Sequence, residues 1–231
     1  MDPNLTIRLE RARSWIYLAQ ALSQTEGVPV ETENAEDETI VAKTRGHERF
    51  IFYWIAFNCL YGRRYYDGFK ADQETDIQKF LKKIKMMNQF SQENSETILE
   101  DAVSACRTFG RKLVLDRFLD DRYWRRQTKI TRIVWDSEER WRQAEKELGM
   151  RKDCGLFLEL TFDRLRVLRN QIMHGCASHG LQSKGYKSLL FGVRFLEIML
   201  PAFFMLTERY GEHVKWEKAP YPRKDHVEHP W

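Results

Sequence analysis

The chain has 231 residues, of which 31% are charged and 13% aromatic, and its mean hydropathy is −0.60. This length is enough to bury one sizeable hydrophobic core. Twelve Gly and six Pro are too few for a many-stranded β protein, whose turns recur about every 8–12 residues. The net charge of +4 permits an acidic partner without requiring one. These values favour a soluble, all-α protein.

Apolar residues recur at helical spacing in most of the chain. The predicted helices cover residues 5–24, 44–66, 72–88, 94–119, 122–148, 155–173 and 186–210. The acidic stretch from about 27 to 42 predicts a loop, since it begins with Gly-Val-Pro. Pro201 predicts a kink or break in the last helix, and the residues after Gly211 predict an irregular tail.

The cysteines and the most apolar segment bear on the cellular location. Cys59, Cys106, Cys154 and Cys176 are widely spaced, and no secretory signal precedes them. We therefore expect reduced thiols and a cytoplasmic protein. The segment from 189 to 206 contains Arg194 and Glu197, whose charges are costly in lipid, so we predict a buried core helix and no membrane partner.

A polar stripe near the end of the helix predicted at 155–173 suggests a functional site. Arg166, Asn170 and His174 are four residues apart and share one helical face, with Arg169 on the next ridge. Arg offers a fork of donors that fits a phosphate, and His exchanges a proton near neutral pH. The stripe favours phosphodiester chemistry, although a solvated helix end has the same composition.

Two segments carry a resemblance to a known family. The pattern Arg169-Asn170-x-x-x-His174-Gly175, preceded by Leu165 and Leu168, resembles the signature of the HEPN superfamily, whose active members are metal-independent endoribonucleases. The segment from Phe52 to Tyr61 resembles the early helix of the Apea-like HEPN branch. Together the two resemblances cover about residues 44–66 and 156–178.

The resemblance implies a single domain with an HEPN-like antiparallel helical bundle. Its core would comprise about residues 1–66 and 151–211, with a helical insertion at about 67–150 and an irregular tail at 212–231. It also implies RNA as substrate and a homodimer in which two copies of the motif face each other. No metal or cofactor is expected.

The expected chemistry follows from the residue types. His174 would transfer protons, Arg169 would stabilise the charge on phosphorus, and Asn170 would orient the imidazole or the phosphate. The products would carry a 2′,3′-cyclic phosphate and a 5′-hydroxyl. Asn58 lies on an apolar stripe and either satisfies nearby backbone or helps to position the motif.

On an unbroken helix, Arg169 and His174 would point about 140° apart. The helix must therefore end or distort near Met173, unless the long Arg169 side chain wraps around it. Gly175 is suited to end the helix in a left-handed conformation.

A basic stretch upstream is a candidate RNA-binding segment. Nine Arg or Lys and three Asp lie between residues 106 and 135. Arg122, Arg125 and Arg126 alternate with two aromatic residues, a pattern that binds single strands by charge and stacking. Together with Arg166 they are the expected substrate-binding residues. The alternative is a solvated helix face.

Other functions are less well supported. His174, Cys176 and His179, with Cys154 as a fourth ligand, match no usual zinc spacing. No cysteine has a pattern typical of a protease nucleophile, and the glycines do not form a phosphate-binding loop. Two alternatives stay open: a non-catalytic RNA-binding or protein-interaction module, and a toxin or defence effector restrained by an inhibitory protein partner.

Overall fold

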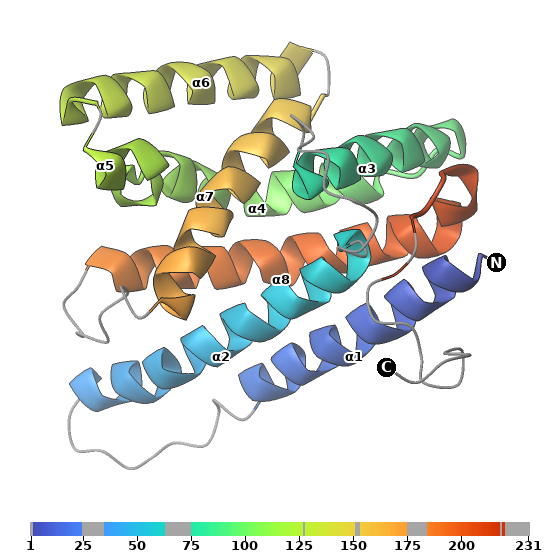
Figure 1. Ribbon diagram of the computed structural model, residues 1–231, viewed down its shortest axis with the longest axis horizontal. Coiled ribbons are helices and arrows are strands. Elements are labelled where there is room, and N and C mark those ends of the chain that lie inside the picture. The colour runs from blue at the N-terminus through green and yellow to red at the C-terminus, as the bar shows by residue number, and fades with distance from the viewer. Residues whose placement is uncertain are drawn as a thin grey trace, which may run out of the picture.

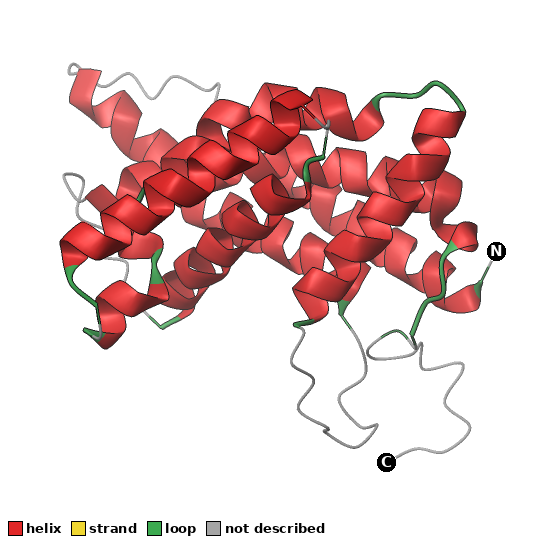
Figure 2. Ribbon diagram, turned by 90° about the horizontal axis from the view of Figure 1, so that it is seen from above, coloured by secondary structure: helices red, strands yellow, loops and turns green. Residues whose placement is uncertain are grey.

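In the computed structural model the protein is all-α (Figures 1 and 2). The structure describes residues 2–24, 35–62, 75–126, 128–150, 153–174, 184–217 and 219, without the side chains of 23–24, 35–44 and 184–186. No strand occurs among them. The helices are α1 (Pro3–Gln24), α2 (Ala35–Tyr61), α3 (Asp76–Glu93), α4 (Ile98–Val114), α5 (Asp121–Arg125), α6 (Ile130–Met150), α7 (Gly155–Met173) and α8 (Lys184–Tyr210), with 3₁₀ turns η2 (Arg117–Leu119) and η3 (Gly211–His213).

Helix α8 is the central element, and helices pack on both of its sides. In Figure 1, α1 and α2 lie on one side of it and α3 and α4 on the other, and all four contact it. Helix α7 crosses this arrangement diagonally and ends near α2, while α6 packs on α7 and α4 at the far edge. Helix α7 therefore contacts both groups of helices, and its C-terminal end lies near α2.

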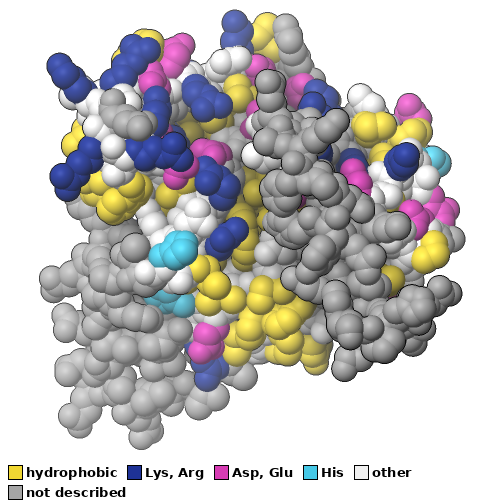
Figure 3. Space-filling model, viewed as in Figure 1, with side chains coloured by type: hydrophobic (Ala, Val, Ile, Leu, Met, Phe, Trp, Pro, Cys, Tyr) yellow, Lys and Arg dark blue, Asp and Glu magenta, His cyan; other side chains and the backbone are white. Residues whose placement is uncertain are grey.

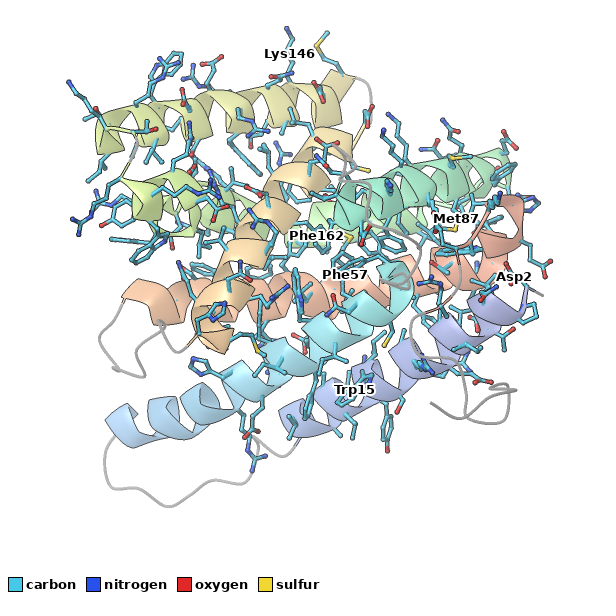
Figure 4. All side chains as sticks on the ribbon, viewed as in Figure 1. Asp2, Trp15, Phe57, Met87, Lys146 and Phe162 are labelled. Atoms are coloured by element: carbon cyan, nitrogen blue, oxygen red, sulfur yellow. The ribbon has the colours of Figure 1, made fainter. Side chains whose placement is uncertain are left out.

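One continuous hydrophobic core joins these helices. Phe57 of α2 and Phe162 of α7 point toward one another, with ring centroids 4.5 Å apart (Figure 4). Phe203 of α8 stacks on Phe162 and meets Phe80 of α3 edge-on, at 5.7 Å in both cases. Such aromatic pairs contribute about 0.5–1.5 kcal/mol beyond the burial of their area. The aromatic cluster fixes where α7 crosses α2 and α8.

Gly192 allows α8 to come close to α2 and α7. A Cβ at this position would lie 2.9 Å from Leu168 Cδ2 of α7 and 3.0 Å from Phe50 Cε2 of α2. Both distances are shorter than ordinary van der Waals contacts. The missing side chain is therefore what lets three helices meet beneath the end of α7.

Helix α8 is the apolar helix predicted from the sequence. By length and composition alone, the stretch Lys187–His213 could cross a membrane, with a mean hydropathy of 1.9 in its most apolar window. Its inward residues are nevertheless buried against the other helices; they are Leu189, Val193, Leu196, Leu200 and Phe203. The helix also continues through Pro201, where we expected a kink or break.

Helix α2 differs from its prediction at both ends. It begins at Ala35, within the stretch predicted as a loop, and ends at Tyr61 instead of near residue 66. The fully buried guanidinium of Arg8 explains the early end. Its Nη1 donates to the carbonyls of Leu60 and Gly62, at 3.1 and 2.5 Å, and so binds groups that a longer helix would need.

The predicted helix at 122–148 is two helices. Helix α5 ends at Arg125, the C-cap residue Arg126 has the left-handed φ of 52°, and α6 begins at Ile130. The helix predicted at 94–119 is likewise shorter, because α4 ends at Val114 and η2 follows. The start of α3 is fixed by a capping box between Thr75 and Gln78, a local signal that is separate from hydrophobic periodicity.

The packing of α4 on α7 gives a first prediction. A Cβ at Gly110 would lie 2.6 Å from Phe157 Cε2, whereas one at Gly149 in α6 would meet nothing within 4 Å. We expect Gly110→Ala to lower the free energy of unfolding by about 1–3 kcal/mol, since overpacking outweighs the gain in helix propensity. Gly149→Ala is the matched control and should raise it by up to about 1 kcal/mol. Urea unfolding measures both; equal effects would contradict the packing described here.

Candidate functional site

Helix α7, which carries the predicted site residues, ends at Met173. Its bounds, Gly155–Met173, agree with the prediction, and His174 is the C-cap residue, whose N–H donates to the Asn170 carbonyl at 3.0 Å. The predicted helix end near Met173 is therefore confirmed. The backbone of His174 has φ −94°, which is not left-handed, and Gly175 lies outside the described residues.

The last turns of α7 have an inner and an outer side. At about 100° per residue, Leu165, Leu168 and Ile172 lie within about 60° of one another and face the core. Asn170 and His174 lie about 40° apart on the opposite side. Accordingly, His174 is exposed and Asn170 half-buried. The amide and the imidazole are thus presented together, away from the core.

Arg169 lies against α2, with its Cζ atom 5.7 Å from the ring centroid of Trp54. No ion pair or hydrogen bond neutralises its guanidinium within the described part of the chain, and its buried Nε has no acceptor there. The buried indole N–H of Trp54 also lacks an acceptor among the described residues. Buried donors are normally satisfied, so a ligand that reached these two donors would have to supply acceptors, as a phosphate does.

A second histidine, His47 of α2, belongs to the same region. Helices α2 and α7 run antiparallel here, because Phe57 meets Phe162 and Trp54 meets Arg169. Beyond the second contact, α7 continues to His174 and α2 leads back to His47, which lies on the same side of α2 as Trp54, within about 20°. In Figure 3, histidine side chains (cyan) gather where the end of α7 meets α2.

We had not predicted a role for His47. The signal in the sequence is its position, seven residues before Trp54, on a helical face that is apolar apart from His47 and Asn58. Asn58, which we had singled out, is half-buried one turn beyond Trp54, and its side chain makes no hydrogen bond within the described residues. Its positioning role stays a prediction, and the α2 residue that contacts the motif is Trp54.

Arg166, also predicted to bind substrate, is held by carboxylates. Its Nη2 lies 2.7 Å from Asp121 of α5 and 3.1 Å from Asp163 of α7. These hydrogen bonds raise the pKa of Arg166 despite partial burial. Within the polar stripe, Asn170 and His174 therefore face outward, whereas Arg166 joins α7 to α5.

Arg164, two residues before Arg166 on α7, forms a buried ion pair with Asp120. It is 6% exposed and donates to Asp120 at 2.7 Å, to Ser137 and to the carbonyls of Val114 and Leu119. Burial alone would raise the pKa of Asp120, but hydrogen bonds from Arg122 and the charge of Arg164 outweigh it and lower this pKa to about 2. The network fixes the segment before α5 against α7.

The three arginines of the basic segment differ in their surroundings. Arg122 is held by Asp120 at 3.0 Å and by Asp136 at 2.7 Å. Arg125 is 65% exposed, and its one ion pair within the described residues is long, at 3.8 Å from Asp121. Arg126 is exposed at the end of α5. Arg125 and Arg126 are thus available to a ligand, whereas Arg122 is largely used within the fold.

The described residues give no support to a thiol nucleophile. Burial raises the pKa of Cys106 and Cys154 to about 12 and also raises that of Cys59, so these three free thiols stay protonated. Cys176 and His179, the other expected zinc ligands, lie outside the described residues, and no group of three metal-ligating side chains occurs within them.

The candidate site is thus one end of α7 and the facing turn of α2. It combines a guanidinium, an amide and imidazoles from two helices, and an aromatic ring supports the guanidinium. Such a set can bind an anionic ester and move protons on it. Comparison of the chain with protein-family models, with curated proteins and with solved structures finds no match.

Proposed function

We propose that this protein is a cytoplasmic, metal-independent endoribonuclease with an HEPN-like antiparallel helical bundle. One observation carries the proposal. The Arg169 guanidinium has no carboxylate partner in the described residues and lies five residues before the exposed His174 at the end of the same helix. A phosphodiester in its pentacoordinate transition state needs positive charge and a proton-transfer group at one place.

The reaction divides among the residues as follows. His174 accepts the proton of the 2′-hydroxyl while that oxygen attacks phosphorus. The bond from phosphorus to the 5′-oxygen breaks, and a second imidazole returns a proton to the leaving oxygen. Arg169 balances the charge on the phosphoryl oxygens, and Asn170, on the same outward side as His174, orients the phosphate. The products are a 2′,3′-cyclic phosphate and a 5′-hydroxyl.

Two histidines are alternative sources of the second imidazole in this proposal. His47 supplies one within a single chain, since α2 runs back from Trp54 toward the end of α7. In the homodimer that the sequence resemblance implies, His174 of a second copy would supply it. The dimer stays a prediction, and the presence of His47 means that a single chain already contains both groups.

Cleavage without metal tests the proposal directly. We expect the purified protein in excess EDTA to cut single-stranded RNA, leaving 2′,3′-cyclic phosphate and 5′-hydroxyl ends that mass spectrometry identifies. RNA with 2′-O-methyl groups throughout is the matched control and should stay intact, because it lacks the attacking hydroxyl. Equal cutting of this control, or loss of cutting in EDTA, would contradict the mechanism. Inactivity toward varied RNAs would favour the non-catalytic module.

A further inference from the structure

Trp124 of α5 is a large exposed aromatic ring that the fold holds in place. Its side chain is 53% exposed, and its indole N–H donates to the Phe118 carbonyl at 2.7 Å. The hydrogen bond satisfies the polar edge of the ring and limits its rotation. What remains exposed is apolar ring surface in a fixed orientation, which is the arrangement that an aromatic stacking partner requires.

The same carbonyl connects this ring to the candidate site. Gln171, in the last turn of α7, donates its side-chain amide to Phe118 O, also at 2.7 Å. Trp124 and Gln171 therefore share one acceptor and lie next to each other. Gln171 directly follows Asn170 in the chain, so the exposed ring stands beside the end of α7 that carries His174.

The neighbouring aromatic residues support the ring without stacking on it. Tyr123 meets Trp124 at an interplanar angle of 79°, with centroids 5.2 Å apart. Phe118 in turn meets Tyr123 at 71° and 4.9 Å. Neither neighbour lies parallel to the next ring, and Trp124 is left half exposed.

The surface around Trp124 is basic. Arg125 and Arg126 are exposed beside it, and the nearby acids are already engaged: Asp120 is buried, and Asp136 pairs with both Arg122 and Arg132. Figure 3 shows Lys and Arg side chains (dark blue) gathered over α5 and the start of α6, on the same face as the histidines. Positive charge beside an exposed ring complements a nucleic-acid strand.

We propose that Trp124 stacks on a base of an unpaired RNA strand, whose backbone is bound by Arg125 and Arg126 and whose next linkages reach His174. The inference rests on the proposed ribonuclease function and adds the substrate class, single-stranded RNA. A duplex does not fit, because its base faces are already stacked on one another. Stacking on an aromatic side chain tolerates every base, so we expect little sequence preference from this contact.

Binding of an uncleavable strand separates this inference from catalysis. The probe is a fluorescently labelled 2′-O-methyl RNA oligonucleotide, and anisotropy gives its Kd. We expect Trp124→Ala to raise Kd by about 10- to 100-fold and Trp124→Phe to raise it much less. Trp135→Ala is the matched control. This ring is also 50% exposed, but Arg132 lies over it at 4.6 Å and no hydrogen bond connects it to α7, so its removal should leave Kd nearly unchanged.

The outcomes are distinguishable. Unchanged Kd in Trp124→Ala, or equal affinity for a duplex of the same sequence, would overturn the stacking site even if the protein cuts RNA. Preferential binding to acidic vesicles instead of RNA would also overturn it. Weakened single-strand binding in a folded Trp124→Ala variant supports the site even if the protein cuts nothing, in which case only the ribonuclease proposal fails. Thermal melting of each variant establishes that it is folded.

Discussion

Replacing His174 with alanine should slow RNA cleavage by about 10²- to 10⁴-fold, the usual contribution of a general acid or base. The side chain is exposed beyond the last turn of α7, and its backbone N–H bond to Asn170 survives the change. Folding stability should therefore hardly change. Single-turnover cleavage in EDTA measures the rate, and thermal melting measures the stability. His213→Ala is the matched control, since that exposed histidine lies in η3 and stacks on Phe90.

Variants of His47 and Arg169 test which group gives a proton to the leaving 5′-oxygen. If one chain contains both groups, His47→Ala should also be slow, and an excess of His174→Ala chains should leave the activity of added wild type unchanged. If two chains form a composite site, mixed dimers lack one imidazole, so the same excess should suppress wild-type activity. Arg169→Lys should also be poor, because one ammonium does not reproduce a bidentate fork. Equal rates for wild type and His174→Ala would refute the assignment of His174.

Replacing Arg164 with alanine should lower the free energy of unfolding by about 3–5 kcal/mol. The change leaves the buried Asp120 carboxylate without its 2.7 Å partner and removes donors from Ser137 and two carbonyls. Urea denaturation measures the loss. Arg166→Ala is the matched control two residues away on the same helix. Its ion pairs are about one-third exposed, so we expect a loss of at most about 1 kcal/mol.

The same network predicts how stability depends on acid. The pKa of Asp120 is lowered from 3.8 to about 2 in the folded protein, so folding favours its ionised form. This contribution is present above pH 3.8 and is lost as the pH falls through about 2. Asp120→Asn should therefore flatten the fall in stability over that range. Similar losses for the Arg164 and Arg166 variants would contradict the distinction between buried and exposed pairs.

Helix α7 was predicted correctly because local signals determine it. Apolar residues at helical spacing indicated its bounds, and a concentration of polar residues in its last turn indicated the end at which the candidate site lies. The helices α1 and α8 were identified in the same way. The all-α class followed from composition and periodicity, without knowledge of how the helices pack.

The features that were not predicted depend on contacts between residues far apart in sequence. The end of α2 depends on Arg8, more than fifty residues earlier, whose guanidinium takes the carbonyls there. The pairing of Arg122 and Arg166 with carboxylates likewise depends on the break at Arg126 and on the placement of α5 against α7. His47 enters the site only because α2 and α7 are antiparallel. None of these contacts has a signal within a single helix.

Arg8 also connects α1 to the segment that follows η3. Besides the end of α2, its guanidinium binds the carbonyl of Glu217 at 3.0 Å and lies over the ring of Trp216. A chain cut after His213 would take this carbonyl and the buried Trp216 ring away from the Arg8 guanidinium. The segment that follows η3 therefore packs against α1 as part of the helical bundle. An affinity tag should be added after this segment and should not replace it.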